Sequence, residues 1–263
     1  MLNDVDIKMT NKYHSANKRL WESTANEWKR KADSRGIWKR CHIEPELTLT
    51  KTELNHIGDV SGKRLCVLGS GDNQTVFAFA GMGAEVTSVD LSQKQLDIAK
   101  ERAEILGLNI SFQQADVLDL SVFPDNSFDN VYTGGFVAPW VSDLDKYYSE
   151  AIRILRSDGR LIVNDAHPFR FIWKNSDSEL VIEHSYLDTG PFRLMLEEDI
   201  FSKKEGSYEA YEFHWKVSDF IMAILKTGAE IKTFIEYGDE VARWERAPYN
   251  GLPESIFIIA EKR

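Results

Sequence analysis

Two glycines and an aspartate stand at a spacing that suits a nucleotide. An apolar run at residues 64 to 68 leads into Gly69, Ser70 and Gly71, and a second apolar run ends in Asp90. A glycine turn between a strand and a helix exposes backbone N–H groups, and an acid about 20 residues further on accepts hydrogen bonds from ribose hydroxyls. The alternative reading of Asp90 is that it only begins the next turn. We interpret the pattern as a nucleotide-binding site.

The residues after the glycines limit which class of nucleotide can bind. A dinucleotide site needs a third small residue three positions after Gly71, and that position holds Gln74. A phosphate-binding P-loop fails as well, because no Gly-Lys-Ser/Thr follows. A nucleoside cofactor without a pyrophosphate remains, and S-adenosylmethionine is the common one. A nicotinamide-dependent oxidoreductase stays as the alternative enzyme, with Gln74 against it.

The elements that must position these residues alternate short apolar runs with amphipathic stretches. This pattern is typical of successive βαβ units with a parallel sheet. We therefore predict an α/β fold with a Rossmann-like, seven-stranded, mostly parallel sheet and helices on both faces. The predicted strands are residues 64–68, 85–89, 109–113, 128–133, 160–164, 229–237 and 255–260, and the predicted helices are 73–82, 92–106, 144–155 and 218–226.

Two segments lie outside this rhythm. Residues 1–44 carry Trp21, Trp28 and Trp38 at roughly helical spacing, which predicts an N-terminal helical cap. Residues 166–213 hold prolines and many aromatics, which predicts an inserted cover over the acceptor after the fifth strand. We expect a single domain, with the cofactor-binding core at 45–165 and residues 214–263 completing the sheet. Both outer segments are expected to close over bound cofactor.

Composition limits the partners. The formal net charge of -10 repels polyanions, so nucleic acid is not expected as a partner. Cys41 and Cys66 are the only cysteines, and Cys66 falls in an apolar run, so neither a disulfide nor a metal site is expected. No apolar run is long enough for a signal region or a membrane span, which predicts a cytoplasmic protein without a membrane partner. The oligomeric state stays open.

Five further runs carry a resemblance to a known family. They are VLGSG at 67–71, VTSVDLS at 86–92, FQQADVLDL at 112–120, FDNVYTGG at 128–135 and ILRSDGRLIVND at 154–165. In this order they resemble the class I S-adenosylmethionine-dependent methyltransferases. The resemblance is to the small-molecule, type 11 group that includes the ubiquinone and menaquinone C-methyltransferases.

The resemblance implies roles for individual residues. The glycine turn lines the methionine and ribose part of the cofactor, Asp90 holds the ribose, and Asp116 accepts the adenine N6 amino group. The remaining implied contacts are Leu91 against adenine, the Val117 backbone N–H toward the adenine ring, and Thr133 with Gly134 beside the methionine part. Two positions depart from the family pattern, namely Val67 in place of an acid and Asn73 in place of a third glycine. These departures favour the second alternative, a non-catalytic cofactor-binding protein.

The acceptor side follows from the chemistry of methyl transfer. An in-line displacement needs an aligned nucleophile about 3 to 3.5 Å from the methyl carbon, with water excluded. Ligands of open α/β sheets bind beyond the carboxyl ends of the strands, which predicts Phe136 and Trp140 at a small-molecule acceptor pocket. The aromatic content of the outer segments adds Trp173 to this pocket. His167 is a candidate proton relay for an acceptor hydroxyl, with a loop histidine bonded to backbone as the alternative.

Overall fold

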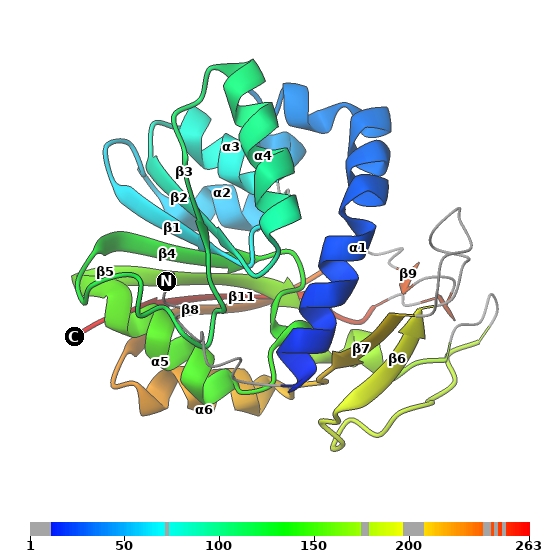
Figure 1. The fold of residues 1–263 in the computed structure, drawn as a ribbon. Helices are drawn as coiled ribbons and strands as arrows, with labels where there is room; N and C mark the ends of the chain where they lie inside the picture. The colour runs from blue at the N-terminus through cyan, green and yellow to red at the C-terminus, as the bar shows by residue number, and fades with distance from the viewer. Residues whose placement is uncertain are drawn as a thin grey trace, which may run out of the picture.

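One seven-stranded sheet forms the centre of the molecule (Figure 1). The computed structural model describes residues 12–71, 74–174, 179–196, 208–238, 243–244, 247–248 and 251–263. The strand order is β3-β2-β1-β4-β5-β11-β8, with β11 antiparallel to both of its neighbours. The sheet strands are β1 (Arg64–Leu68), β2 (Glu85–Asp90), β3 (Ser111–Gln114), β4 (Phe128–Gly134), β5 (Leu155–Ala166), β8 (Glu230–Tyr237) and β11 (Ser255–Glu261). The predicted Rossmann-like sheet is therefore confirmed.

Helices cover both faces of this sheet. The α-helices are α1 (Lys12–Arg35), α2 (Lys51–Ile57), α3 (Thr75–Gly81), α4 (Gln93–Leu106), α5 (Leu144–Ile154) and α6 (Val217–Lys226). The 3-10 helices are η1 (Ile37–Lys39), η2 (Pro45–Leu47), η3 (Ala138–Trp140) and η4 (Pro168–Phe171). Two short hairpins complete the described elements, namely β6 (Phe192–Leu196) with β7 (Tyr208–Glu212) and β9 (Arg243–Trp244) with β10 (Ala247–Pro248).

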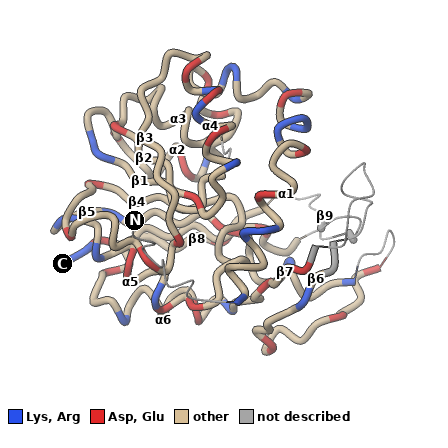
Figure 2. The backbone as a smooth tube through the Cα atoms, in the orientation of Figure 1, with Lys and Arg blue, Asp and Glu red and all other residues tan. Residues whose placement is uncertain are grey.

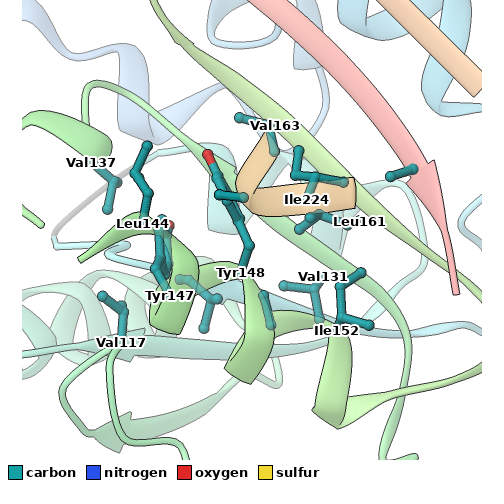
Figure 3. Close-up of a cluster of buried hydrophobic side chains, with 14 of the residues drawn as sticks. Val117, Val131, Val137, Leu144, Tyr147, Tyr148, Ile152, Leu161, Val163 and Ile224 are labelled. Atoms are coloured by element: carbon teal, nitrogen blue, oxygen red, sulfur yellow. The ribbon is translucent and has the colours of Figure 1, made fainter. Parts of the chain in front are cut away.

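The apolar run of β1 explains why helices lie on both faces. Side chains alternate across a strand, so a run that is apolar at every position must be buried on both sides. Leu65 and Val67 pack in the cluster with α3 and α4, whereas Cys66 and Leu68 pack in the cluster with α5 and α6. Figure 3 shows the second cluster, where Tyr148 of α5 and Ile224 of α6 lie among strand side chains.

Element boundaries differ from the predictions at a few places. The predicted fifth strand begins at Arg160, but β5 begins at Leu155, directly after α5. Asp158, predicted as part of a turn, adopts a positive φ of 59° inside this strand, where the register with β4 shifts. The helix predicted from residue 92 is capped by Ser92, whose side chain accepts a hydrogen bond from the Gln95 backbone N–H.

Helix α1 lies beside the carboxyl ends of the central strands, and hairpin β6–β7 packs against its first half (Figure 1). Asn17 fixes this contact, because its side-chain amide exchanges two hydrogen bonds with the Tyr211 backbone at 2.8 and 2.9 Å. Burial of Asn17 makes both bonds valuable, since an unpaired amide there would cost about 1 to 3 kcal/mol. The two segments predicted as covers thus contact each other.

Charged residues of both signs are interspersed along the backbone, α1 included (Figure 2). Lys29 pairs with Asp33 at 3.1 Å, and Asp33 also accepts from Arg102 at 3.0 Å, which ties α1 to α4. Cys66 is fully buried, and burial raises the pKa of its thiol. Within the described residues, no helix combines the length and apolarity that a membrane crossing requires.

Candidate active site

A cavity of about 500 Å³ opens at the carboxyl ends of β1, β2 and β4. This is where ligands bind in open α/β sheets. Its volume falls in the range of about 300 to 1,000 Å³ that is usual for small-molecule sites. The lining residues are His14, Asn17, Trp21, Trp28, Arg35, Gly69, Ser70, Gly71, Asp90, Leu91, Gln95, Asp116, Val117, Gly135, Phe136, Val137, Trp140 and Val141.

The glycine turn presents bare backbone to this cavity. Gly69 and Gly71 adopt positive φ angles of 62° and 52°. A Cβ on Gly69 would lie 2.7 Å from both Cγ atoms of Val137, so a side chain there would force Val137 to move. Ser70 is buried and its Oγ lies 2.7 Å from the Ser88 Oγ, which anchors the turn to β2. The predicted close approach of backbone to a ligand fits this geometry.

Asp90 stands at the end of β2 and joins two pieces of backbone. One carboxylate oxygen accepts from the Gly71 N–H at 2.7 Å, and the other accepts from the Ser92 N–H at 2.8 Å. A carboxylate accepts up to about four hydrogen bonds in all, which suits a residue that contacts both backbone and hydroxyl groups. Leu91 follows directly and also lines the cavity. The sequence therefore identified the acid that reaches the glycine turn.

Asp116 also lines the cavity, but its carboxylate is shared with a histidine that the sequence did not single out. His14 of α1 places its Nδ1 2.8 and 2.9 Å from the two Asp116 oxygens. Its Nε2 lies 3.1 Å from the Ser142 backbone N, which can only donate. The Nδ1–H tautomer of a neutral imidazole satisfies both contacts. His14 thus links the loop after β3 to the loop after β4.

The last residues of β4 are more deeply buried than we predicted. Thr133 is buried, with its Oγ1 in a hydrogen bond with the Tyr147 hydroxyl. Neither Thr133 nor Gly134 belongs to the cavity lining, whereas the following residues 135 to 137 do. At the end of this strand the cavity lining therefore begins at Gly135, the residue after the predicted pair.

Asp165, near the end of β5, fixes the loop that follows β4. Its carboxylate is buried and accepts from the Ala138 N–H at 2.9 Å and the Ala166 N–H at 2.7 Å. Burial raises the pKa of Asp165 to about 6, although the backbone hydrogen bonds act in the opposite direction. Phe136, two residues before the clamped amide, adopts a positive φ of 68°, which is uncommon for a residue with a large side chain. The Asp165 hydrogen bonds thus fix the backbone directly after Phe136, which lines the cavity.

Helix α1 supplies one wall of the cavity with residues spaced by seven. His14, Trp21, Trp28 and Arg35 all line the cavity, and residues two turns apart share one helix face. Trp21 packs edge-on against Trp140, with ring centroids 4.9 Å apart. We predicted tryptophans in this helix but not the contributions of His14, Asn17 and Arg35. The heptad spacing of the four residues was the available signal.

Two predicted site residues lie elsewhere. His167 is fully buried, donates from Nε2 to Glu236 at 2.7 Å and accepts at Nδ1 from the Phe169 N–H at 3.1 Å. Burial lowers the pKa of His167, and the imidazole serves as the N-cap of η4. Trp173 forms a β-bridge with Ile182. Neither residue lines the cavity. Asn73, the predicted departure from the glycine pattern, lies outside the described residues.

Comparisons with known proteins agree with this architecture. Residues 66–163 match the family described as a methyltransferase domain. An uncharacterized methyltransferase of Bacillus subtilis, YbaJ, is 28% identical over 233 residues, which cover 84% of this chain and 89% of that protein. The demethylmenaquinone methyltransferase of Thermus thermophilus is 38% identical over 100 residues, 38% of this chain and 44% of that one.

A solved structure shares the fold. The S-adenosylmethionine-dependent methyltransferase of Mesorhizobium loti superposes with a TM-score of 0.60 at 23% identity, covering 80% of this chain and 95% of that one. Together, the family match and the relatives identify residues 66–163 as a methyltransferase domain, and the solved structure shows that the chain has the fold of an S-adenosylmethionine-dependent methyltransferase. S-adenosylmethionine is its cofactor, and the nicotinamide-dependent oxidoreductase considered as an alternative is not supported.

Proposed function

We propose that this enzyme methylates a small, largely apolar molecule that binds beside Phe136 and Trp140. The observation that carries the proposal is the division of the cavity into two kinds of lining. One part offers the glycine turn, Asp90 and Asp116, which suit a nucleoside. The other part offers aromatic rings from α1 and from the loop after β4. Apolar pockets with few polar groups are typical of small-molecule sites.

The residues present fit S-adenosylmethionine, which when bound supplies an electrophilic methyl group on a sulfonium. In our proposal, the backbone at Gly69 and Gly71 lies against the methionine and ribose part, because no Cβ intervenes there. The Asp90 carboxylate accepts hydrogen bonds from the ribose hydroxyls, and the Asp116 carboxylate accepts one from the adenine amino group. Leu91 and Val117 provide apolar contact for the adenine ring.

The chain's remaining work is to position the acceptor and exclude water. Trp21 and Trp140 close one side of the cavity, and their ring faces also attract a cation by about 0.5 to 2 kcal/mol per contact. Among the described lining residues, the only histidine is His14, and both its ring nitrogens are engaged. We propose that the acceptor reacts without a side-chain base from this wall. A relay through His167 would require it to leave Glu236 and the Phe169 N–H.

The names of two relatives support an apolar ring as acceptor. The Thermus thermophilus protein is named for demethylmenaquinone, and a Brucella suis relative, 32% identical over 165 residues, is named for ubiquinone and menaquinone biosynthesis. Those matches cover 44% and 54% of the two proteins, so about half of each relative lies outside the match. We therefore propose the chemical class, an apolar cyclic acceptor, and not a particular quinone.

Binding and turnover test the proposal separately. Calorimetry should show that the chain binds S-adenosylhomocysteine but neither NAD nor NADP. Asp90→Ala should weaken that binding by about 10- to 150-fold, since charge-assisted hydrogen bonds contribute about 1.5 to 3 kcal/mol. Methyl-labelled S-adenosylmethionine with a panel of acceptors should then label apolar cyclic compounds. Labelling confined to nucleic acids or proteins would overturn the proposed acceptor class, and unchanged affinity in folded Asp90→Ala would overturn the ribose assignment.

A further inference from the structure

Gln95 is a buried polar side chain of the cavity wall that no role above has used. It stands in the first turn of α4, three residues after the capping Ser92. The residue is 5% exposed, and its Oε1 has no hydrogen-bond partner among the described residues. The neighbouring Gln93 behaves differently, because its side-chain amide donates to Asp97 at 2.8 Å on the exposed side of the helix.

An unpaired amide oxygen at such a position is costly. Buried polar groups are nearly always hydrogen-bonded, and an exception calls for an explanation such as a ligand. A methionine or leucine would pack in the same helix turn without that cost. Gln95 lines the same cavity as Leu91 and Val117, the two residues proposed to contact adenine, and it follows Leu91 by four residues in the chain. We therefore expect its amide to be within reach of the nucleobase.

Adenine has hydrogen-bonding groups on two edges. Asp116 and the Val117 N–H are assigned above and in the family pattern to one N6 hydrogen and the ring. The second N6 hydrogen and N7 then remain, and they form a donor next to an acceptor. A glutamine amide matches this pair with two hydrogen bonds, as it does when proteins recognise adenine in DNA. The amide can rotate to present either atom.

We propose that Gln95 binds the N6–N7 edge of the cofactor's adenine and selects adenine over other bases. This inference rests on S-adenosylmethionine as the cofactor and on Asp116 as a contact of the same base. It explains why a polar residue occupies a buried position in the first turn of α4. It also gives the orphaned Oε1 a partner that enters with the ligand.

Binding of S-adenosylhomocysteine and of its 7-deaza analogue, in which a C–H replaces N7, tests the proposal by calorimetry. The wild-type chain should bind the 7-deaza analogue about tenfold more weakly, as expected for the loss of one bond of a bidentate pair. Gln95→Met should bind both compounds with equal affinity. Gln93→Met, from the exposed side of the same turn, is the matched control and should keep the tenfold preference.

Thermal unfolding of the ligand-free variants distinguishes a structural role of Gln95 from a role in ligand binding. Removing an orphaned acceptor should leave the Tm of Gln95→Met unchanged or higher. The proposal is overturned if the wild type binds both compounds equally, if Gln95→Met keeps the preference, or if the Tm of ligand-free Gln95→Met falls by several degrees. The last result would show that Gln95 pairs within the protein, for example with the buried indole N–H of Trp28, which also lines the cavity without a described partner. Failure of the wild type to bind S-adenosylhomocysteine would instead reject the cofactor-site assignment itself.

Discussion

The glycine turn at residues 69 to 71 and helix α1 face the same cavity, yet different forces shape them. The turn is fixed by backbone geometry and by contacts to its neighbours in the sheet, through Ser88, Asp90 and Val137. Helix α1 is fixed by side chains that reach residues more than 100 positions away, through His14 and Asn17. A ligand site can thus combine a backbone surface that cannot adjust with a side-chain surface that can.

The largest change in stability is expected at Asp165, which holds the loop that packs on the glycine turn through Val137. Burial raises the pKa of Asp165 to about 6, so the folded chain keeps this proton to a higher pH than the unfolded chain. The free energy of unfolding should therefore fall as the pH rises from about 4 to about 6, by at most about 3 kcal/mol for this group. Urea unfolding across this range should show the fall in the wild type and lose that component in Asp165→Asn. Parallel curves for the two proteins would contradict the prediction.

Gly69→Ala should have the second-largest effect. The positive φ and the 2.7 Å approach to Val137 together should lower the free energy of unfolding by about 1 to 3 kcal/mol. Affinity for S-adenosylhomocysteine should fall at least tenfold. Gly107→Ala is the control, because Gly107 has a similar φ of 67° but nothing within 4 Å of an added Cβ. That variant should lose stability without losing affinity, and equal losses of affinity in both would place the effect in strain alone.

The side-chain wall should respond less. His14→Leu removes the bonds to Asp116 and Ser142, which should lower the free energy of unfolding by about 1 kcal/mol per hydrogen bond lost. Affinity for S-adenosylhomocysteine should change by less than threefold, since the turn and Asp90 remain in place. Denaturant unfolding and calorimetry measure the two quantities. A loss of affinity as large as that of Gly69→Ala would show that wall and turn are not independent.

Hydrogen exchange should give the smallest signal. If α1 is the adjustable side, its amides should exchange faster than those of β1 in the free protein and gain several-fold protection with S-adenosylhomocysteine. Exchange in α1 that is as slow as in β1, and that does not change with ligand, would mean that α1 is a permanent part of the fold. The expected closing of residues 1–44 over the cofactor would then be wrong.

The contrast between local geometry and long-range side-chain contacts also explains which features could be predicted from the sequence. The strands, the glycine turn and Asp90 were predicted because each depends on local periodicity or on a fixed spacing along the chain. His14 was missed because its partners, Asp116 and Ser142, lie 102 and 128 residues away. His167 drew attention for its position after β5, but its partner Glu236 belongs to β8, whose neighbour in the sheet could not be read from the chain order.

Strand β11 determines when the sheet can be completed during synthesis. It lies between β5 and β8 and pairs with both along its full length, although it is made later than either. Until residues 255 to 261 leave the ribosome, the edges of β5 and β8 have no partner between them. Unpaired strand edges invite association with other chains. Of the seven strands, the one that comes last in the chain is therefore the one that joins β8 to the other five, and a nascent chain stalled just before it would be the form most exposed to aggregation and to chaperones.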